Sequence, residues 1–243
     1  MPQTFAGYTE TSVNAFEFNP KNQEVVDRKQ EILRAIAQHH GNNPTSVLFY
    51  GFSPMMLGAG YKQLAVTYIN PQIKKFLDLR GVKYTHIAEE DLGNYRKSFD
   101  WVVATDEYFT FASSEEQQQT AMQLATGLAK NIIVTTLRDY KNQDFRDREF
   151  SQPLAVHASS DTKLYLEYHN YDYTDKNAWT TMVYEMHGRN AVTHGPFARR
   201  SMFFKQMANF SISAGAKNFY VHKNLMYKSL IKKNYEHVIS ISF

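Results

Sequence analysis

The chain has 243 residues, no cysteine, 43% hydrophobic and 14% aromatic residues, and a formal net charge of +3. Its length and apolar content suffice for one large core, so we expect a single domain over residues 1–243. The lack of cysteine excludes disulfides and cysteine nucleophiles, and it favours a cytoplasmic protein. No apolar run approaches the roughly 18 to 20 residues of a membrane-spanning helix, so no membrane partner is expected.

The positive charge is concentrated in the last third of the chain. Residues 1–157 hold 16 Lys and Arg against 18 Asp and Glu, whereas residues 158–243 hold 11 against 6. Such a surplus could attract a phosphate-bearing partner, but most imbalances of this size are a solvated surface. Nucleic acid is therefore open as a partner but is not favoured.

An amphipathic helix precedes a run of alternating strands and helices. Apolar residues recur at helical spacing from about residue 23 to 40, and residues 41–44 (Gly-Asn-Asn-Pro) end that pattern. Short runs rich in apolar, β-branched and aromatic residues then predict strands separated by helices. The predicted strands cover residues 46–50, 64–69, 84–87, 101–105 and 131–136, and the predicted helices cover 72–80 and about 113–129.

The alternation of strands and helices favours right-handed crossovers and a parallel sheet with both faces covered. The last third of the chain differs. It begins with two strand-like runs separated by a polar turn, which predict a hairpin insertion at about 162–186. The other predicted elements there are a helix at 200–214 and strands at 218–222 and 237–243. The sequence thus predicts an α/β domain.

This order of elements resembles that of the class I S-adenosylmethionine-dependent methyltransferases over residues 23–243. Residues 98–108 are similar to the family's fourth strand and the substrate-facing turn after it, with Phe99 and Asp100 at the start of the strand. Asn70, between an isoleucine and a proline, is similar to the turn after the second strand. The resemblance implies a three-layer Rossmann-like sandwich with a mostly parallel seven-stranded sheet of order 3-2-1-4-5-7-6, strand 7 being antiparallel.

The resemblance also implies that S-adenosylmethionine binds over the carboxyl ends of the first three strands. In the family, the first turn pairs an acid with alternating glycines, because the methionine part of the cofactor approaches the bare backbone there. Here Phe49 stands in place of the acid, and Ser53 and Met55 stand in place of later glycines. Only Gly51 keeps its expected place.

The other implied cofactor contacts are altered as well. Asn70 replaces the acid that binds the ribose hydroxyls, and its amide accepts with one oxygen only. Ala88 replaces the adenine-binding acid, with Glu89 beside it. The candidate cofactor-binding residues are therefore Gly51, Ser53, Asn70, Glu89 and Thr105. Taken singly, they could be ordinary turn or helix-start residues, and only their joint placement favours a site.

Asp106 and Glu107 directly follow the predicted fourth strand. Loops at the ends of parallel strands are where such folds present their chemistry, so these carboxylates are the candidate catalytic proton acceptors. Tyr108, the next residue, is a candidate substrate contact.

Aromatic residues gather in the predicted hairpin, and a pair of arginines follows it. The hairpin could present a stacking surface for a flat substrate, with Trp179 as the candidate contact, or it could simply pack its rings across the strands. Arg199 and Arg200, with Lys205, could hold a phosphate group or flank the start of a helix. The aromatic set is Tyr165, Tyr168, His169, Tyr171, Tyr173, Trp179 and Tyr184.

Several chemistries are disfavoured by missing motifs. No phosphate-binding loop, nucleophile elbow or dinucleotide fingerprint occurs. His187 and His194 have no third ligand at metal-binding spacing, so we expect no metal. Two functions remain open, since a fold does not decide function. One is a divergent methyltransferase with an unknown acceptor, and the other is a pseudoenzyme that serves as an interaction or assembly module, for instance a viral structural protein.

Overall fold

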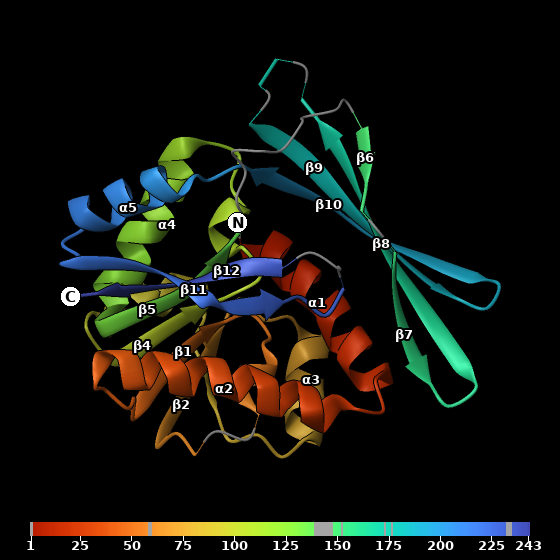
Figure 1. The fold of residues 1–243 in the computed structure, drawn as a ribbon, viewed down its shortest axis with the longest axis horizontal. Coiled ribbons are helices and arrows are strands. Elements are labelled where there is room, and N and C mark those ends of the chain that lie inside the picture. The colour runs from red at the N-terminus through yellow and green to blue at the C-terminus, as the bar shows by residue number, and fades with distance from the viewer. Residues whose placement is uncertain are drawn as a thin grey trace.

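The computed structural model describes residues 2–57, 60–138, 148–151, 153–172, 174–175, 177–231 and 235–243. Two β-sheets lie side by side in it, and the helix α1 (Pro2–Phe18) lies between them (Figure 1). The larger sheet has helices on both faces. The smaller sheet is antiparallel, and α1 contacts four of its strands.

The larger sheet has the order β11-β12-β5-β4-β1-β2-β3. Five neighbouring strands, from β5 through β4, β1 and β2 to the edge strand β3, are parallel to one another. Strand β12 is antiparallel to both of its neighbours, β5 and β11. This confirms the order 3-2-1-4-5-7-6 with an antiparallel seventh strand. The strands are β1 (Ser46–Tyr50), β2 (Gln63–Thr67), β3 (Thr85–His86), β4 (Phe99–Ala104), β5 (Ala129–Leu137), β11 (Asn218–Lys228) and β12 (Tyr235–Ser242).

The two faces of this sheet carry separate hydrophobic clusters, because successive residues of a strand point to opposite faces. In β4, for example, Trp101 and Val103 pack toward α2 and α3, whereas Val102 and Ala104 belong to the cluster that contains α4 and α5 residues. The helices are α2 (Asn22–His40), α3 (Pro71–Leu79), α4 (Glu115–Leu128) and α5 (Phe204–Ser213), and the 3-10 turns are η1 (Pro54–Met56), η2 (Glu89–Tyr95) and η3 (Tyr108–Thr110). None of the described helices is long and apolar enough to cross a membrane.

The predicted hairpin is the centre of a larger antiparallel sheet of order β10-β9-β8-β6, in which β7 also pairs with β8. Its strands are β6 (Arg148–Phe150), β7 (Leu154–Ala158), β8 (Asp161–Tyr171), β9 (Ala178–His187) and β10 (Asn190–Arg200). The prediction of a helix from residue 200 was wrong at its start, because Arg200 ends β10 and α5 begins at Phe204. The first half of β10 is mostly exposed, so it has no apolar alternation that would mark a strand.

The helix α1 was not predicted from the sequence. Phe5, Tyr8 and Phe16 stand at helical spacing and are each at most 1% exposed. The helix also buries polar side chains, among them Thr9 and Ser12. The positions of α1 that are not buried form a narrow stripe through Gly7, Glu10, Asn14 and Glu17, and the buried threonines and serine weaken the contrast between the two faces.

Candidate functional site

The turn after β1 is where a cofactor is expected to approach the backbone, and α1 lies directly on it. Gly51 has φ +66, a left-handed conformation that favours glycine, and its N–H donates to the Thr67 carbonyl at 2.9 Å. A Cβ atom added at Gly51 would lie 2.7 Å from Phe5 Cε1 and 2.9 Å from Thr9 Cγ2. The close approach that the glycine permits is therefore made by α1.

Ser53 and Asn70, two other predicted cofactor contacts, cap local structure. Ser53 precedes η1, and its Oγ accepts from the Met55 N–H at 3.4 Å. Asn70 precedes α3, and its Oδ1 accepts from the Ile73 N–H at 2.9 Å. The Asn70 amide group also donates to the Glu10 carboxylate of α1. Asn70 thus ties α1 to the end of β2.

Glu89 and Thr105 lie at the ends of β3 and β4. Glu89 begins η2 after Ala88 and is exposed, with a pKa raised by partial burial. Burial raises the pKa values of the Tyr68 and Tyr108 phenols, and the negative charge of Glu89 raises them further. Thr105 is 2% exposed, and its carbonyl accepts from the Tyr108 N–H at 3.3 Å.

A cluster of aromatic rings fills the space above these strand ends. The ring centroid of Tyr50 lies 4.9 Å from that of Tyr68 and 4.7 Å from that of Tyr108, and Phe5 of α1 lies 4.9 Å from Tyr108. Burial raises the pKa of Tyr68 to about 12, and it also raises the pKa of the Tyr50 and Tyr108 phenols well above their usual value. With α1 in place, the rings and the helix leave no room for S-adenosylmethionine at this position.

The loop that follows Gly51 is filled from the other side of the sheet. Phe52, Met55 and Met56 are at most 2% exposed and belong to the cluster formed with α2 and α3. Phe52 makes edge contacts with Phe16 of α1 at 5.8 Å and with Phe76 of α3 at 5.2 Å. These apolar contacts hold the loop closed against the body of the protein.

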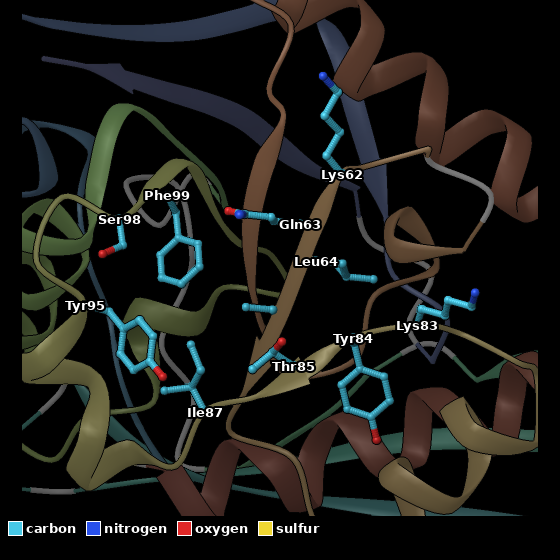
Figure 2. A pocket seen from close by; sticks show the side chains of 11 residues that line it. Lys62, Gln63, Leu64, Lys83, Tyr84, Thr85, Ile87, Tyr95, Ser98 and Phe99 are labelled. Atoms are coloured by element: carbon cyan, nitrogen blue, oxygen red, sulfur yellow. The ribbon is translucent and has the colours of Figure 1, made fainter.

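A surface cavity of the described chain lies at the other end of the strands. This cavity, shown in Figure 2, has a volume of about 560 Å³ and is lined by the first residues of β2 and β4 together with β3. Tyr95, Phe99 and Ile87 form its apolar part, while Lys62 and Lys83 extend outward at its rim (Figure 2). It therefore sits at the amino ends of the strands, opposite to the end where the predicted site residues lie.

Several buried polar atoms beneath and within α1 have no hydrogen-bond partner in the described part of the chain. They are the Tyr50 hydroxyl, Thr67 Oγ1, Asp106 Oδ1 and Ser12 Oγ. Tyr50 and Thr67 are paired neighbours at the ends of β1 and β2, and Asp106 follows β4. Buried polar atoms in proteins are nearly always bonded, and each exception costs about 1–3 kcal/mol.

Asp106 and Glu107, the predicted catalytic pair, have two consecutive left-handed backbone conformations with φ +55 and +56. Such conformations are costly for residues other than glycine and gather at functional sites. The two carboxylates point to different partners. Asp106 Oδ2 accepts from the Tyr227 hydroxyl at 2.8 Å, whereas Glu107 Oε2 lies 3.1 Å from Arg199 Nη2 and 3.3 Å from Arg138 Nε.

Arg199 is fully buried between the two sheets. Its guanidinium group donates to Thr110 Oγ1 at 2.7 Å and lies 4.4 Å from the ring centroid of Phe111. Trp179 is 4% exposed, and Arg199 lies 5.6 Å from its ring. Arg200 faces away and pairs with Asp175.

Of the predicted substrate contacts, the structure brings Tyr108, Trp179 and Arg199 toward α1 and leaves Arg200 outside. Tyr173 of the predicted aromatic set lies outside the described residues.

The smaller sheet holds α1 through polar contacts that the sequence does not indicate. The Tyr8 hydroxyl donates to Glu167 Oε1 of β8 at 2.6 Å, and both side chains are buried. Asn14 donates to Glu185 Oε2 of β9 at 3.2 Å. Bonds to His194 and Lys163 lower the pKa of Glu185 to about 2, against the effect of burial. These partners are more than 150 residues apart, so no local pattern indicates them.

The strand order, with an antiparallel strand inserted beside the edge strand, defines the class I S-adenosylmethionine-dependent methyltransferase fold. Similar solved structures include DesVI of Streptomyces venezuelae (10% identity, TM-score 0.65, 91% of this chain and 92% of that chain covered) and the CcbJ methyltransferase of Streptomyces caelestis (14%, 0.62, 89% and 94%). CalS10, an amino pentose methyltransferase from Micromonospora echinaspora solved with S-adenosylmethionine bound, is also similar (10%, 0.62, 89% and 90%). At these identities the likeness establishes the fold. No family model and no curated protein matches the sequence.

Proposed function

We propose that this protein is an S-adenosylmethionine-dependent methyltransferase whose cofactor position is covered by the first turns of α1 in the present structure. The observation that carries the proposal is the set of unpartnered polar atoms at the ends of β1, β2 and β4. A core that served packing alone would place apolar groups there, because unpartnered hydroxyl and carboxylate oxygens destabilise it. A polar ligand with several hydroxyl and amino groups would supply the missing partners.

The fit to the cofactor depends on α1. With Phe5 and Thr9 against Gly51 the cofactor does not fit, and no catalytic step can be derived for this arrangement. If the first turns moved aside, the Gly51 backbone, the Tyr50 hydroxyl and Thr67 Oγ1 would face the bound molecule, with Asn70 freed from Glu10. The cofactor would then supply the methyl group. The acceptor stays unassigned, and the fold's substrate side is where Asp106 and Glu107 lie.

The movement of α1 sets the expected affinity. Exposing Phe5 and Tyr8 costs about 3–6 kcal/mol, at about 1.5–3 kcal/mol for each large apolar side chain. If that cost is taken from the binding free energy, the observed affinity falls by a factor of about 10² to 10⁴. A cofactor that would bind at micromolar concentration to an open site is therefore expected to bind the native chain only at about 0.1 to 10 mM.

The test is calorimetric titration of the native chain and of Phe5→Ala with S-adenosylmethionine and S-adenosylhomocysteine. Because Phe5→Ala removes packing that covers the site, it should bind at least tenfold more tightly than the native chain while being less stable. Met207→Ala, which removes a fully buried side chain from α5, is the matched control and should not gain affinity. Phe5→Leu, a smaller change, serves the same purpose if Phe5→Ala does not fold.

A further variant separates ligand binding from packing. Thr67→Val replaces an unpartnered buried hydroxyl by a methyl group, so the free protein should become more stable by about 1 kcal/mol. In the Phe5→Ala background the same change should weaken cofactor binding at least fivefold. Greater stability without a loss of affinity would show that Thr67 does not contact the ligand.

The second candidate is a non-catalytic protein that keeps the fold as an interaction or assembly module. The observation that favours it is Phe49, which stands where the family has an acid and is fully buried against α2 and α3. If neither the native chain nor Phe5→Ala and Phe5→Leu give heat at millimolar cofactor, the methyltransferase proposal is refuted and this second function takes its place.

A further inference from the structure

The smaller sheet has two faces of different chemistry. The odd-numbered residues of β8 and β9 point toward α1 and include Glu167 and Glu185, which bind Tyr8 and Asn14. The even-numbered residues point the other way and form what we call the outer face. Figure 1 shows α1 on one side of this sheet and no helix on the other side.

Four successive rows of the outer face are mostly apolar and hold no charged side chain across three strands; the next row adds Arg200, which lies opposite Ala178 and binds Asp175. Cross-strand neighbours place leucine, methionine, tyrosine, threonine and alanine side chains side by side, and Phe150 of β6 extends the face with a ring 4.8 Å from that of Tyr168. Phe150 is 62% exposed and Leu164 is 37% exposed. The rows of the face are Leu164, Met186 and Ala191; Leu166, Tyr184 and Thr193; Tyr168 and Met182; and Asn170, Thr180 and Ala198.

This chemistry indicates what would cover the face. A partner that binds by electrostatic complementarity needs charged groups on the surface that it contacts. The described outer-face side chains of these four rows carry no charge. Interfaces between identical subunits are more apolar than those of transient complexes. A sheet face also packs readily on a copy of itself across a two-fold axis, with strands of the two sheets about 30° apart.

The size of the face meets the need of a dimer. Three strands about 4.8 Å apart and about 30 Å long, widened on the β8 side by β6 and β7, cover roughly 570 Å² in plan. Side-chain relief makes the accessible area larger than the plan area. A specific interface buries roughly 600–1,000 Å² on each partner. The outer face supplies that area with little help from neighbouring loops.

We infer that the protein forms a symmetric homodimer in which the outer faces of the two smaller sheets pack against each other. Each chain then has its smaller sheet covered by its own α1 on one side and by the second copy on the other. The inference concerns assembly only and holds whether or not the chain binds S-adenosylmethionine.

The test is sedimentation velocity of the full chain over about 1 to 100 μM, together with two single variants. The native chain should sediment with twice the chain mass of 28.2 kDa. Met182→Lys, in the middle of the face, and Thr193→Arg, at an exposed position whose exchange removes no buried contact, should each sediment as monomers and keep the native circular dichroism. Ile212→Lys, which replaces an apolar side chain that is 59% exposed on α5, should stay dimeric.

A native chain that is monomeric at every concentration overturns the inference, and so does a dimer that survives Thr193→Arg. Loss of the dimer in Ile212→Lys as well would place the interface elsewhere and overturn it too. If Met182→Lys does not fold, Thr193→Arg alone decides the question, because its side chain is in solvent in the single chain.

Discussion

Gly51→Ala provides a direct measure of how closely α1 approaches the turn after β1. Gly51 and Gly81 have the same backbone angle, φ +66. An alanine in that conformation costs about 1–2 kcal/mol at either position. The surroundings differ, since an added Cβ would meet Phe5 at 2.7 Å and Thr9 at 2.9 Å at Gly51 but nothing within 4 Å at Gly81.

The difference between the two variants isolates the contact with α1. Overpacking of a filled core costs about 1–3 kcal/mol. We therefore expect Gly51→Ala to lower the free energy of unfolding by about 2–5 kcal/mol and Gly81→Ala by about 1–2 kcal/mol. The effect of alanine on the unfolded chain is common to both and cancels.

Equilibrium urea unfolding, followed by circular dichroism at equal protein concentration, measures both values. Adding Phe5→Ala to Gly51→Ala should recover about 1 kcal/mol relative to the sum of the single changes, because the two sites are in contact. If Gly51→Ala proves no more destabilising than Gly81→Ala, α1 does not lie on the turn, and the account of the covered cofactor position fails.

Two further predictions concern buried or partly buried charges. Arg199→Met removes one partner of the buried Glu107 carboxylate and should lower the free energy of unfolding by about 3–5 kcal/mol. Adding Glu107→Gln should recover part of that loss, because the buried charge is then removed as well. If the losses of the two single variants simply add in the double variant, the two side chains are not paired. Burial, with the charges of His39 and His40, lowers the pKa of His222 to about 4. The unfolded chain then binds the extra proton from about pH 6.5 downward, so stability should fall by about 1–2 kcal/mol between pH 6.5 and 4, after allowance for solvent screening. His222→Gln should flatten that pH profile of urea unfolding, and an unchanged profile would assign the loss to other groups.

The larger sheet could be predicted from the sequence because its strands are buried on both faces. The strand at 46–50 was predicted with the bounds that the structure has, since all five of its residues are buried. The bounds of β4 and β5 differ from the predicted ones by at most two residues. The strand order followed from the family resemblance, and the structure confirms it.

The smaller sheet and α1 could not be predicted in the same way. β10 runs along the edge of its sheet with most residues of its first half exposed, so neither face leaves an apolar pattern. In α1, threonine and serine are buried beside aromatic rings, which hides the helical period. Only the spacing of Phe5, Tyr8 and Phe16 could have indicated this helix.

The candidate site was located by the sequence only in part. Gly51, Asn70 and Asp106 do lie at neighbouring strand ends, which the resemblance implied. What covers them depends on contacts with residues 5 to 10, and a pattern read along the chain carries no information on such long-range contacts. The same limit applies to Glu107 and Arg199, which were predicted for separate roles and form one buried ion pair.

The two proposals meet at the smaller sheet, whose inner face binds α1 and whose outer face is assigned to the second copy. Tyr8 and Asn14 bind this sheet from opposite halves of α1. If only the first turns of α1 move, Tyr8→Phe should raise cofactor affinity, because it removes the 2.6 Å bond to Glu167. Thr193→Arg, which acts on the outer face, should then leave that affinity unchanged. A change in affinity on loss of the dimer would instead mean that α1 and the whole sheet move together, since the second copy can influence the site only through the strands that hold the helix.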